Sequence, residues 1–155
     1  MHNTLTIQRA TAADAERITN HRYLMFVEIG GSDPKLLSDS LPLFTTWVRG
    51  RLANGEYIGL MAMDGDMVAA SAGLWRMAFL PGPMNLSGER AYILNVYTDP
   101  AYRGRGLAKK LVSQLVDEAQ ALGLHVIELH ASNAGRPIYE SIGFEGTNQM
   151  RLYKP

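Results

Sequence analysis

The segment 91–131 constrains the fold more than any other part of the sequence, because it predicts a strand, a loop, a long helix and a second strand in direct succession. The first strand is predicted at Ala91–Thr98 and is followed by a turn at Asp99-Pro100. A helix is predicted over Gly106–Leu122, where one face carries Leu107, Leu111, Val112, Leu115, Val116, Ala119 and Leu122. The second strand is predicted at His125–Ala131. A connection this long implies parallel strands joined by a right-handed crossover.

The rest of the chain supplies further elements around this unit. Apolar and polar residues alternate over Thr4–Arg9, and Asp64-Gly65 is a good hairpin turn between two later strands. Including the unit above, strands are predicted at Thr4–Arg9, Tyr57–Met63, Met67–Trp75, Ala91–Thr98, His125–Ala131 and Gln149–Tyr153. Helices are predicted from Ala15 to Gly30-Gly31, over Leu36–Leu52, Gly106–Leu122 and Arg136–Ile142, with a Pro/Gly-rich loop at Phe79–Gly88. The sequence therefore predicts a single α/β domain over residues 1–155, built on one mixed sheet.

Composition narrows the classes of function. Fifteen basic and 15 acidic residues give a formal net charge of zero, which argues against a nucleic-acid or anionic-membrane partner. The chain has no cysteine, so it has no disulfide, no thiolate metal ligand and no cysteine nucleophile. No apolar run approaches the roughly 20 residues of a membrane span, and the first residues lack the pattern of a signal peptide. We therefore expect a cytoplasmic protein.

The loop between the first predicted strand and the long helix has the chemistry of an anion site. Gly104 and Gly106 allow a close approach to the backbone. The free N–H groups of the first helical turn point towards the anion, with the positive end of the helix dipole behind them. Arg103, Arg105 and Lys109 add positive charge. A pyrophosphate is the ligand that this loop predicts.

Three phosphate-binding motifs compete for this loop. The P-loop string G-x-x-x-x-G-K-[ST] is absent. The dinucleotide string G-x-G-x-x-G fails because Lys109 stands at its last position. The third motif, R-x-x-G-x-[GA], is filled by Arg103, Gly106 and Ala108. It closely resembles the acetyl-CoA signature of the GNAT N-acetyltransferase superfamily.

The resemblance to this superfamily extends beyond one string. The preceding strand with Val96 and Thr98 is similar to the family's usual lead-in. Downstream, Tyr139-Glu-Ser-Ile-Gly-Phe144 looks like the family's Y-x-x-x-G-F segment. Asn133 looks like the asparagine that precedes this segment in the family, although it lies six residues before Tyr139 where seven is common. Chain length and element order match as well.

The resemblance implies a mixed sheet of six to seven strands flanked by about four helices and splayed between the fourth and fifth strands, with acetyl-CoA in the splay. The backbone of Val96 and Thr98 would hold the pantetheine arm. A bulge near Asn95–Val96 would free an N–H group for the thioester carbonyl. Backbone N–H groups would hold the pyrophosphate, from Gly104, Arg105, Gly106, Leu107 and Ala108. Asn133 would contact the pantetheine, and Tyr139 would protonate the departing thiolate as general acid.

The residues that receive the acceptor are less defined. The amine must lose a proton, and the candidate bases are Glu28, Glu89, His21 and His130. Glu28 and Asn95 are placed in the acceptor site, where Asn95 would orient the substrate. For His21 a surface position is expected. No metal site is predicted, because His125, Glu128 and His130 do not share one strand face.

The resemblance implies an acyl-CoA-dependent N-acyltransferase, most simply one that acetylates a primary amine of a small molecule or peptide by direct attack. A catalytically silent acyl-CoA-binding sensor or interaction module is the alternative. The presence of Tyr139 favours the enzyme, because a sensor has no need of a proton donor. Dimers are frequent in the family, so a homodimer is compatible with the resemblance.

Overall fold

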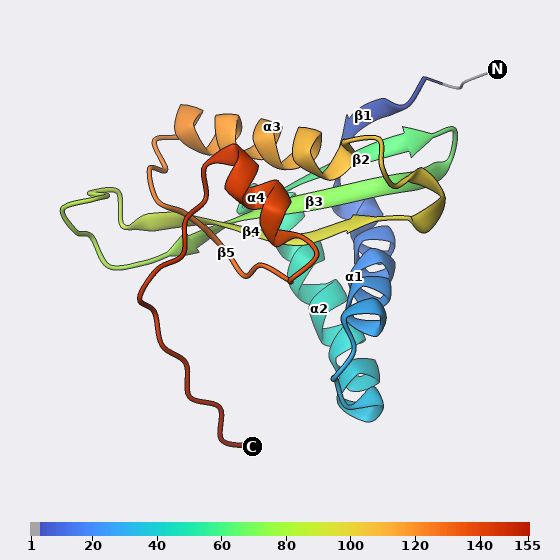
Figure 1. Cartoon of the computed structure of the whole chain (residues 1–155), viewed down its shortest axis with the longest axis horizontal. Helices are drawn as coiled ribbons and strands as arrows, with labels where there is room; N and C mark the ends of the chain where they lie inside the picture. The colour runs from blue at the N-terminus through green and yellow to red at the C-terminus, as the bar shows by residue number, and fades with distance from the viewer. Residues whose placement is uncertain (1–3) are drawn as a thin grey trace.

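A computed structural model describes residues 4–155 (Figure 1). Its strands are β1 (Thr6–Arg9), β2 (Tyr57–Asp64), β3 (Met67–Ala78), β4 (Glu89–Thr98) and β5 (Ile127–Leu129). Its helices are α1 (Ala15–Ile29), α2 (Pro34–Asn54), α3 (Leu107–Ala121) and α4 (Arg136–Ile142), with short 3-10 turns η1 (Ala12–Asp14) and η2 (Pro100–Tyr102). All four predicted helices are therefore confirmed, with ends that differ by a few residues.

The strands form one mixed sheet in the order β1-β2-β3-β4-β5. Neighbours are antiparallel except for β4 and β5, which are parallel and are connected through α3, as the sequence predicts. The expectation of six to seven strands is wrong for the described chain: the sheet has five. Gln149–Tyr153, predicted as the last strand, has no strand partner there, and Met150, Leu152 and Tyr153 are exposed. An extended segment becomes a strand only when a neighbour accepts its backbone hydrogen bonds.

Helices cover both faces of the sheet, α3 and α4 on one side and α1 and α2 on the other (Figure 1). The alternation along β2 shows why. Leu60 and Ala62 belong to the core cluster with α3, whereas Met61 and Met63 belong to the cluster with α1 and α2. A central strand that is buried on both faces is apolar throughout rather than alternating. That accounts for the run Tyr57-Ile-Gly-Leu-Met-Ala-Met63.

The sheet opens where β4 and β5 should continue side by side. Their pairing ends at Ile93 with Leu129, while β4 runs on to Thr98. The register between β3 and β4 slips after Leu94, so that Tyr97 faces Ser71 and one extra residue of β4 forms a bulge. The predicted splay between the fourth and fifth strands is thus present. The bulge also lies at Asn95–Val96, as predicted.

No helix of the described residues 4–155 is long and apolar enough to span a membrane.

One expectation about α1 is wrong. His21, expected at the surface, is buried, and its Nδ1 atom lies 2.7 Å from the Ser71 hydroxyl of β3. Its helix packs on β4 and β3, so this position of α1 faces the sheet.

Candidate functional site

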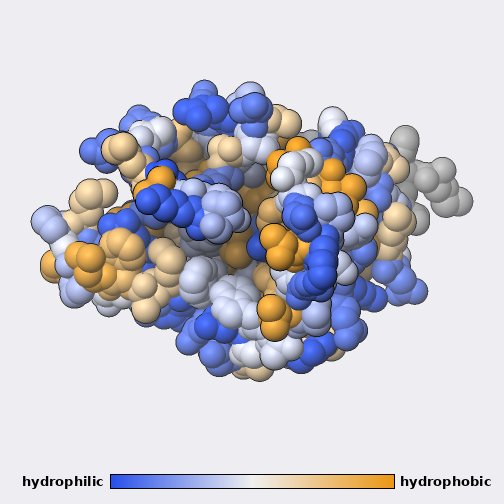
Figure 2. All heavy atoms as spheres, turned by 90° about the horizontal axis from the view of Figure 1, so that it is seen from below, coloured by the Kyte–Doolittle hydropathy of each residue, from blue (hydrophilic) through white to orange (hydrophobic). Residues whose placement is uncertain are grey.

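A cleft of about 1070 Å³ occupies the opening between β4 and β5. Its walls come from α1 and α2 on one side, the end of β5 and the start of α4 on another, and the loop before α3. Figure 2 shows this hollow near the centre of the molecule, with apolar residues in its depth. A cavity of this size and mixed lining is typical of a small-molecule site.

One end of the cleft is formed by the first turn of α3. The backbone N–H groups of Leu107, Ala108 and Lys109 have no acceptor among residues 4–155, and the first capping bond of the helix runs from the Lys110 N–H to the Gly106 carbonyl. Gly104 and Gly106 have φ of +76° and +72°, and a Cβ atom at either would meet open space. The loop therefore exposes a row of donors with room for a ligand above them. This arrangement fits a pyrophosphate.

The side chains of the two arginines in this loop make their contacts away from these backbone N–H groups. Arg103 forms an ion pair with Glu28 of α1 at 2.5 Å and donates through Nε to the Thr98 carbonyl. Arg105 lies over the Tyr102 ring and is not among the residues that line the cleft. Backbone donors, and not guanidinium groups, therefore dominate this end of the cleft. The Arg103–Glu28 pair joins α1 to the loop beside the cleft.

The middle of the cleft is the free edge of β4. Its residues Leu94–Thr98, which include the predicted Val96 and Thr98, line the cavity beyond the last pair with β5. Asn95 sits in the bulge with φ of +55°, a left-handed conformation that asparagine tolerates better than most residues. An unpaired strand edge offers N–H and C=O groups to an extended ligand, as a further strand would.

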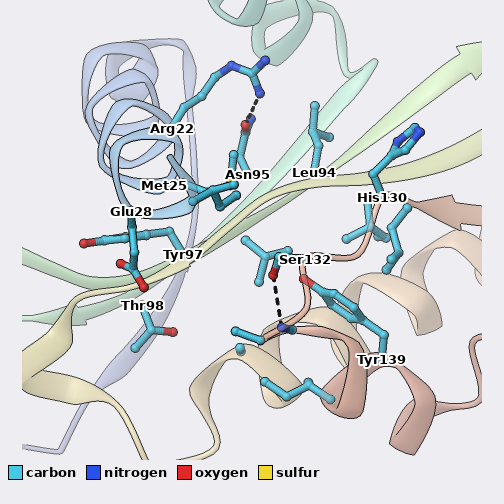
Figure 3. A pocket seen from close by; sticks show the side chains of 18 of the residues that line it. Arg22, Met25, Glu28, Leu94, Asn95, Tyr97, Thr98, His130, Ser132 and Tyr139 are labelled. Carbon is cyan, nitrogen blue, oxygen red and sulfur yellow. Dashed lines mark hydrogen bonds between the residues drawn. The ribbon is translucent and has the colours of Figure 1, made fainter. Parts of the chain in front are cut away.

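Tyr139 of α4 faces the same space from the opposite wall (Figure 3). Its side chain is mostly buried, its ring packs on Phe144, and its hydroxyl has no hydrogen-bond partner among the described residues. Burial raises the pKa of this phenol above its ordinary value. The hydroxyl is therefore protonated at neutral pH and available as a donor.

At the other end of the cleft, three side chains form a chain of hydrogen bonds that sequence reasoning missed. Arg22 of α1 donates through Nη1 to the Asn95 side-chain oxygen at 2.7 Å (Figure 3). The Asn95 amide in turn donates to the Tyr57 hydroxyl at 3.0 Å. A Cβ atom at Gly73 would lie 1.9 Å from that hydroxyl, so glycine is required there. In the sequence, Arg22 lies four residues after Ile18 and four before Phe26, so it falls within the apolar stripe of α1. An arginine in such a stripe is the sequence signal that could have indicated a functional residue here.

Two of the four candidate bases line the cleft and two do not. Glu28 and His130 are lining residues, whereas the buried His21 and Glu89, which pairs with Arg76, are not. Both lining groups already have partners. Glu28 binds Arg103, and His130 contacts the Tyr92 hydroxyl through Nδ1 and receives a hydrogen bond from Arg151 at Nε2.

Asn133 is exposed and does not line the cleft; its neighbour Ser132 does, and the Ser132 hydroxyl accepts from the Gly135 N–H at 3.1 Å (Figure 3). Asn133 lies six residues before Tyr139, where seven is common in the family, and its position outside the cleft goes with this shorter spacing.

Residues 4–155 contain no group of His, Cys, Asp and Glu side chains that could hold a metal ion.

The comparisons with known proteins agree with this geometry. The model of the acetyltransferase (GNAT) family matches residues 16–144. The chain belongs to the GNAT acetyltransferase family. It is 33% identical to the L-methionine sulfoximine/L-methionine sulfone acetyltransferase of Salmonella typhimurium, over 94% of this chain and 83% of that protein.

Two solved structures are close to this GNAT chain in shape. A GCN5-related N-acetyltransferase from Ralstonia eutropha superposes with a TM-score of 0.91 at 32% identity, covering 97% of this chain and 99% of the other. A predicted acetyltransferase from Clostridium acetobutylicum, solved with acetyl-CoA, gives 0.90 at 28% identity, covering 97% and 96%. The protein is thus an N-acetyltransferase of the GNAT family, with acetyl-CoA as its co-substrate.

Proposed function

We propose that this protein transfers an acetyl group from acetyl-CoA to a primary amine of a small molecule or peptide by direct attack, with Tyr139 as general acid. The observation that carries this proposal is the meeting of three features in one cleft. These are the open first turn of α3, the bulged free edge of β4, and the unpartnered hydroxyl of the mostly buried Tyr139, which lines the cleft. Each suits a different part of the same co-substrate.

The roles follow from the donors that each wall supplies. N–H groups from Gly104 to Ala108 bind the pyrophosphate, and the β4 edge at Val96 and Thr98 binds the pantetheine amides. A backbone N–H at the bulge, Asn95–Val96, donates to the thioester carbonyl oxygen, where negative charge develops as the amine attacks. Tyr139 donates its phenolic proton to the sulfur as the carbon–sulfur bond breaks, so that CoA leaves as a neutral thiol.

The attacking amine must first release a proton. The two lining groups that could take it directly, Glu28 and His130, are held by Arg103 and Arg151. We propose that water in the open cleft carries the proton away, either to bulk solvent or to one of these groups. The tetrahedral carbon then collapses with loss of the thiol, and the products are an amide and CoA.

A panel of primary amines with acetyl-CoA tests this function, with the release of thiol as readout. The protein contributes no background because it has no cysteine. We expect thiol release that depends on one class of amine, with a product heavier by one acetyl group in mass spectrometry. Saturable acetyl-CoA binding without release of thiol, over the whole panel, would contradict the proposal and favour a silent acyl-CoA-binding module.

A further inference from the structure

The acceptor end of the cleft holds a cation that no carboxylate neutralises. Arg22 forms no ion pair within residues 4–155, and its single hydrogen bond there goes to the neutral Asn95 side chain. Its Nε and Nη2 atoms have no partner among these residues and are not sealed from the cleft, which the side chain lines. By contrast, Arg103 at the opposite end is neutralised by Glu28.

The guanidinium of Arg22 is also fixed in place. Its central carbon lies 4.8 Å from the Phe26 ring centroid and 4.6 Å from that of Phe44, so two aromatic rings hold it. The Asn95 amide cannot turn away, because its nitrogen is bound to the buried Tyr57 hydroxyl. A guanidinium held in one orientation binds a planar anion with little further loss of side-chain freedom.

The groups around this end strengthen its positive character. Arg151 from the C-terminal segment also lines the cleft, beside His130 and Tyr92. The nearest carboxylate on β5, Glu128, is paired with Arg90. Partial burial lowers the pKa of Arg22, which reflects the cost of holding a charge away from water. An anionic ligand would offset that cost.

The geometry points to a carboxylate on the acceptor, bound by the free guanidinium nitrogens of Arg22. This inference rests on the proposed function and specifies its substrate class as amines that also carry a carboxylate, in the manner of a free amino acid. Arg22 contacts the side chain of the bulge residue Asn95, so an acid anchored there holds a nearby amine close to the site of transfer. The aromatic residues Phe44, Trp47 and Trp75 line the space left for an apolar side chain.

A two-by-two comparison tests this subsite. Wild-type protein and Arg22→Gln are each assayed with L-phenylalanine or L-methionine and with the corresponding primary amides. We expect the wild type to favour the acids, and Arg22→Gln to lose about tenfold to a hundredfold in kcat/KM for the acids only, the range for a charged hydrogen bond. The acids and the amides differ in the intrinsic reactivity of their amines. This difference cancels when the acid-to-amide ratio of kcat/KM in the variant is divided by the same ratio in the wild type.

Three controls make the result specific. Arg17→Gln removes an arginine on the same helix that pairs with Asp14 and does not line the cleft, and it should leave both substrates unaffected. Arg22→Lys keeps the charge without the planar fork and should lie between wild type and Arg22→Gln. Calorimetric affinity for acetyl-CoA should be the same in all variants, which also reports that each is folded.

The inference is overturned if Arg22→Gln lowers activity on acids and amides by the same factor, or if the wild type prefers the amides. Calorimetric binding of the same acids and amides to the protein saturated with CoA gives an answer that needs no turnover. Carboxylate-dependent binding without thiol release would contradict the proposed function and support the carboxylate subsite. Thiol release without carboxylate preference would support the proposed function and contradict the subsite.

Discussion

The two ends of the cleft are built in different ways. The end formed by the loop and α3 comes from one continuous segment, Thr98–Lys109, whose glycines and helix start create the donors within a few residues. The end around Arg22 is assembled from α1, β2, β4 and the C-terminal segment. The first is therefore a local property of the sequence, whereas the second exists only after the chain has folded. The following predictions test that contrast, from the largest expected effect to the smallest.

Tyr139→Phe tests whether the general acid lies on the wall between the two ends of the cleft. Removal of the hydroxyl should lower kcat by about 10²–10⁴-fold, the usual contribution of a general acid, and should leave acetyl-CoA affinity nearly unchanged, because the thioester sulfur is uncharged in the ground state. Steady-state kinetics and calorimetry measure the two quantities. Tyr23→Phe, at an exposed site on α1 outside the cleft lining, is the matched control. Wild-type turnover in folded Tyr139→Phe would remove Tyr139 from the mechanism.

Gly106→Asp attacks the local end directly. Gly106 has φ of +72°, and a carboxylate there would face the pyrophosphate and repel it. Affinity for CoA should fall by about tenfold to a hundredfold, as expected when charged hydrogen bonds are lost. Gly123→Asp is a close control, since Gly123 has φ of +76° at the far end of α3 and also faces open space. Equal losses of affinity in both variants would mean that backbone strain, and not the anion site, is responsible.

Tyr57→Phe attacks the assembled end. The variant leaves the buried Asn95 amide without its acceptor, which should lower the free energy of unfolding by about 1–3 kcal/mol in chemical denaturation. The Asn95–Arg22 contact should loosen, so KM for the acceptor should rise while CoA affinity is retained. Burial raises the pKa of Tyr57 to about 12, so these effects should not depend on pH between 6 and 9. A change in CoA affinity as large as that in acceptor KM would show that the two ends are not separable.

His21→Asn should have the smallest effect, which is confined to the pH dependence of stability. Burial lowers the pKa of His21 below its ordinary value of 6.5, so the unfolded chain takes up this proton at a higher pH than the folded chain. Its contribution to stability is therefore present above about pH 6.5 and declines as the pH falls towards the folded value, below which it is constant. Thermal or denaturant unfolding of His21→Asn should show less loss between pH 7 and 5 than the wild type. Identical pH profiles would mean that His21 titrates as it does in water.

The contrast between the two ends also explains what the sequence could predict. The helix spacing from Leu107 to Leu122 and the motif with Gly104 and Gly106 depend on neighbours within a few residues, and α3 and its open first turn lie where expected. The splay and the bulge at Asn95–Val96 were predicted through the resemblance and are present.

Contacts between distant segments were not predicted. The burial of His21 depends on Ser71, and the position of Arg22 depends on Asn95, 73 residues further along the chain. The missing sixth strand has the same origin. Residues 149–153 have the composition of a strand, but a strand also needs a neighbour, and no local pattern reveals whether one is present.

A crystal structure of the protein with acetyl-CoA tests the central claim most directly. The account predicts the pyrophosphate on the N–H groups at the start of α3 and the thioester carbonyl oxygen about 2.7–3.2 Å from a backbone nitrogen at Asn95–Val96. It also predicts the sulfur beside the Tyr139 hydroxyl, with the Arg22 nitrogens left free for an acceptor. A thioester bound away from the β4 bulge, or a pyrophosphate held at Arg22, would contradict it.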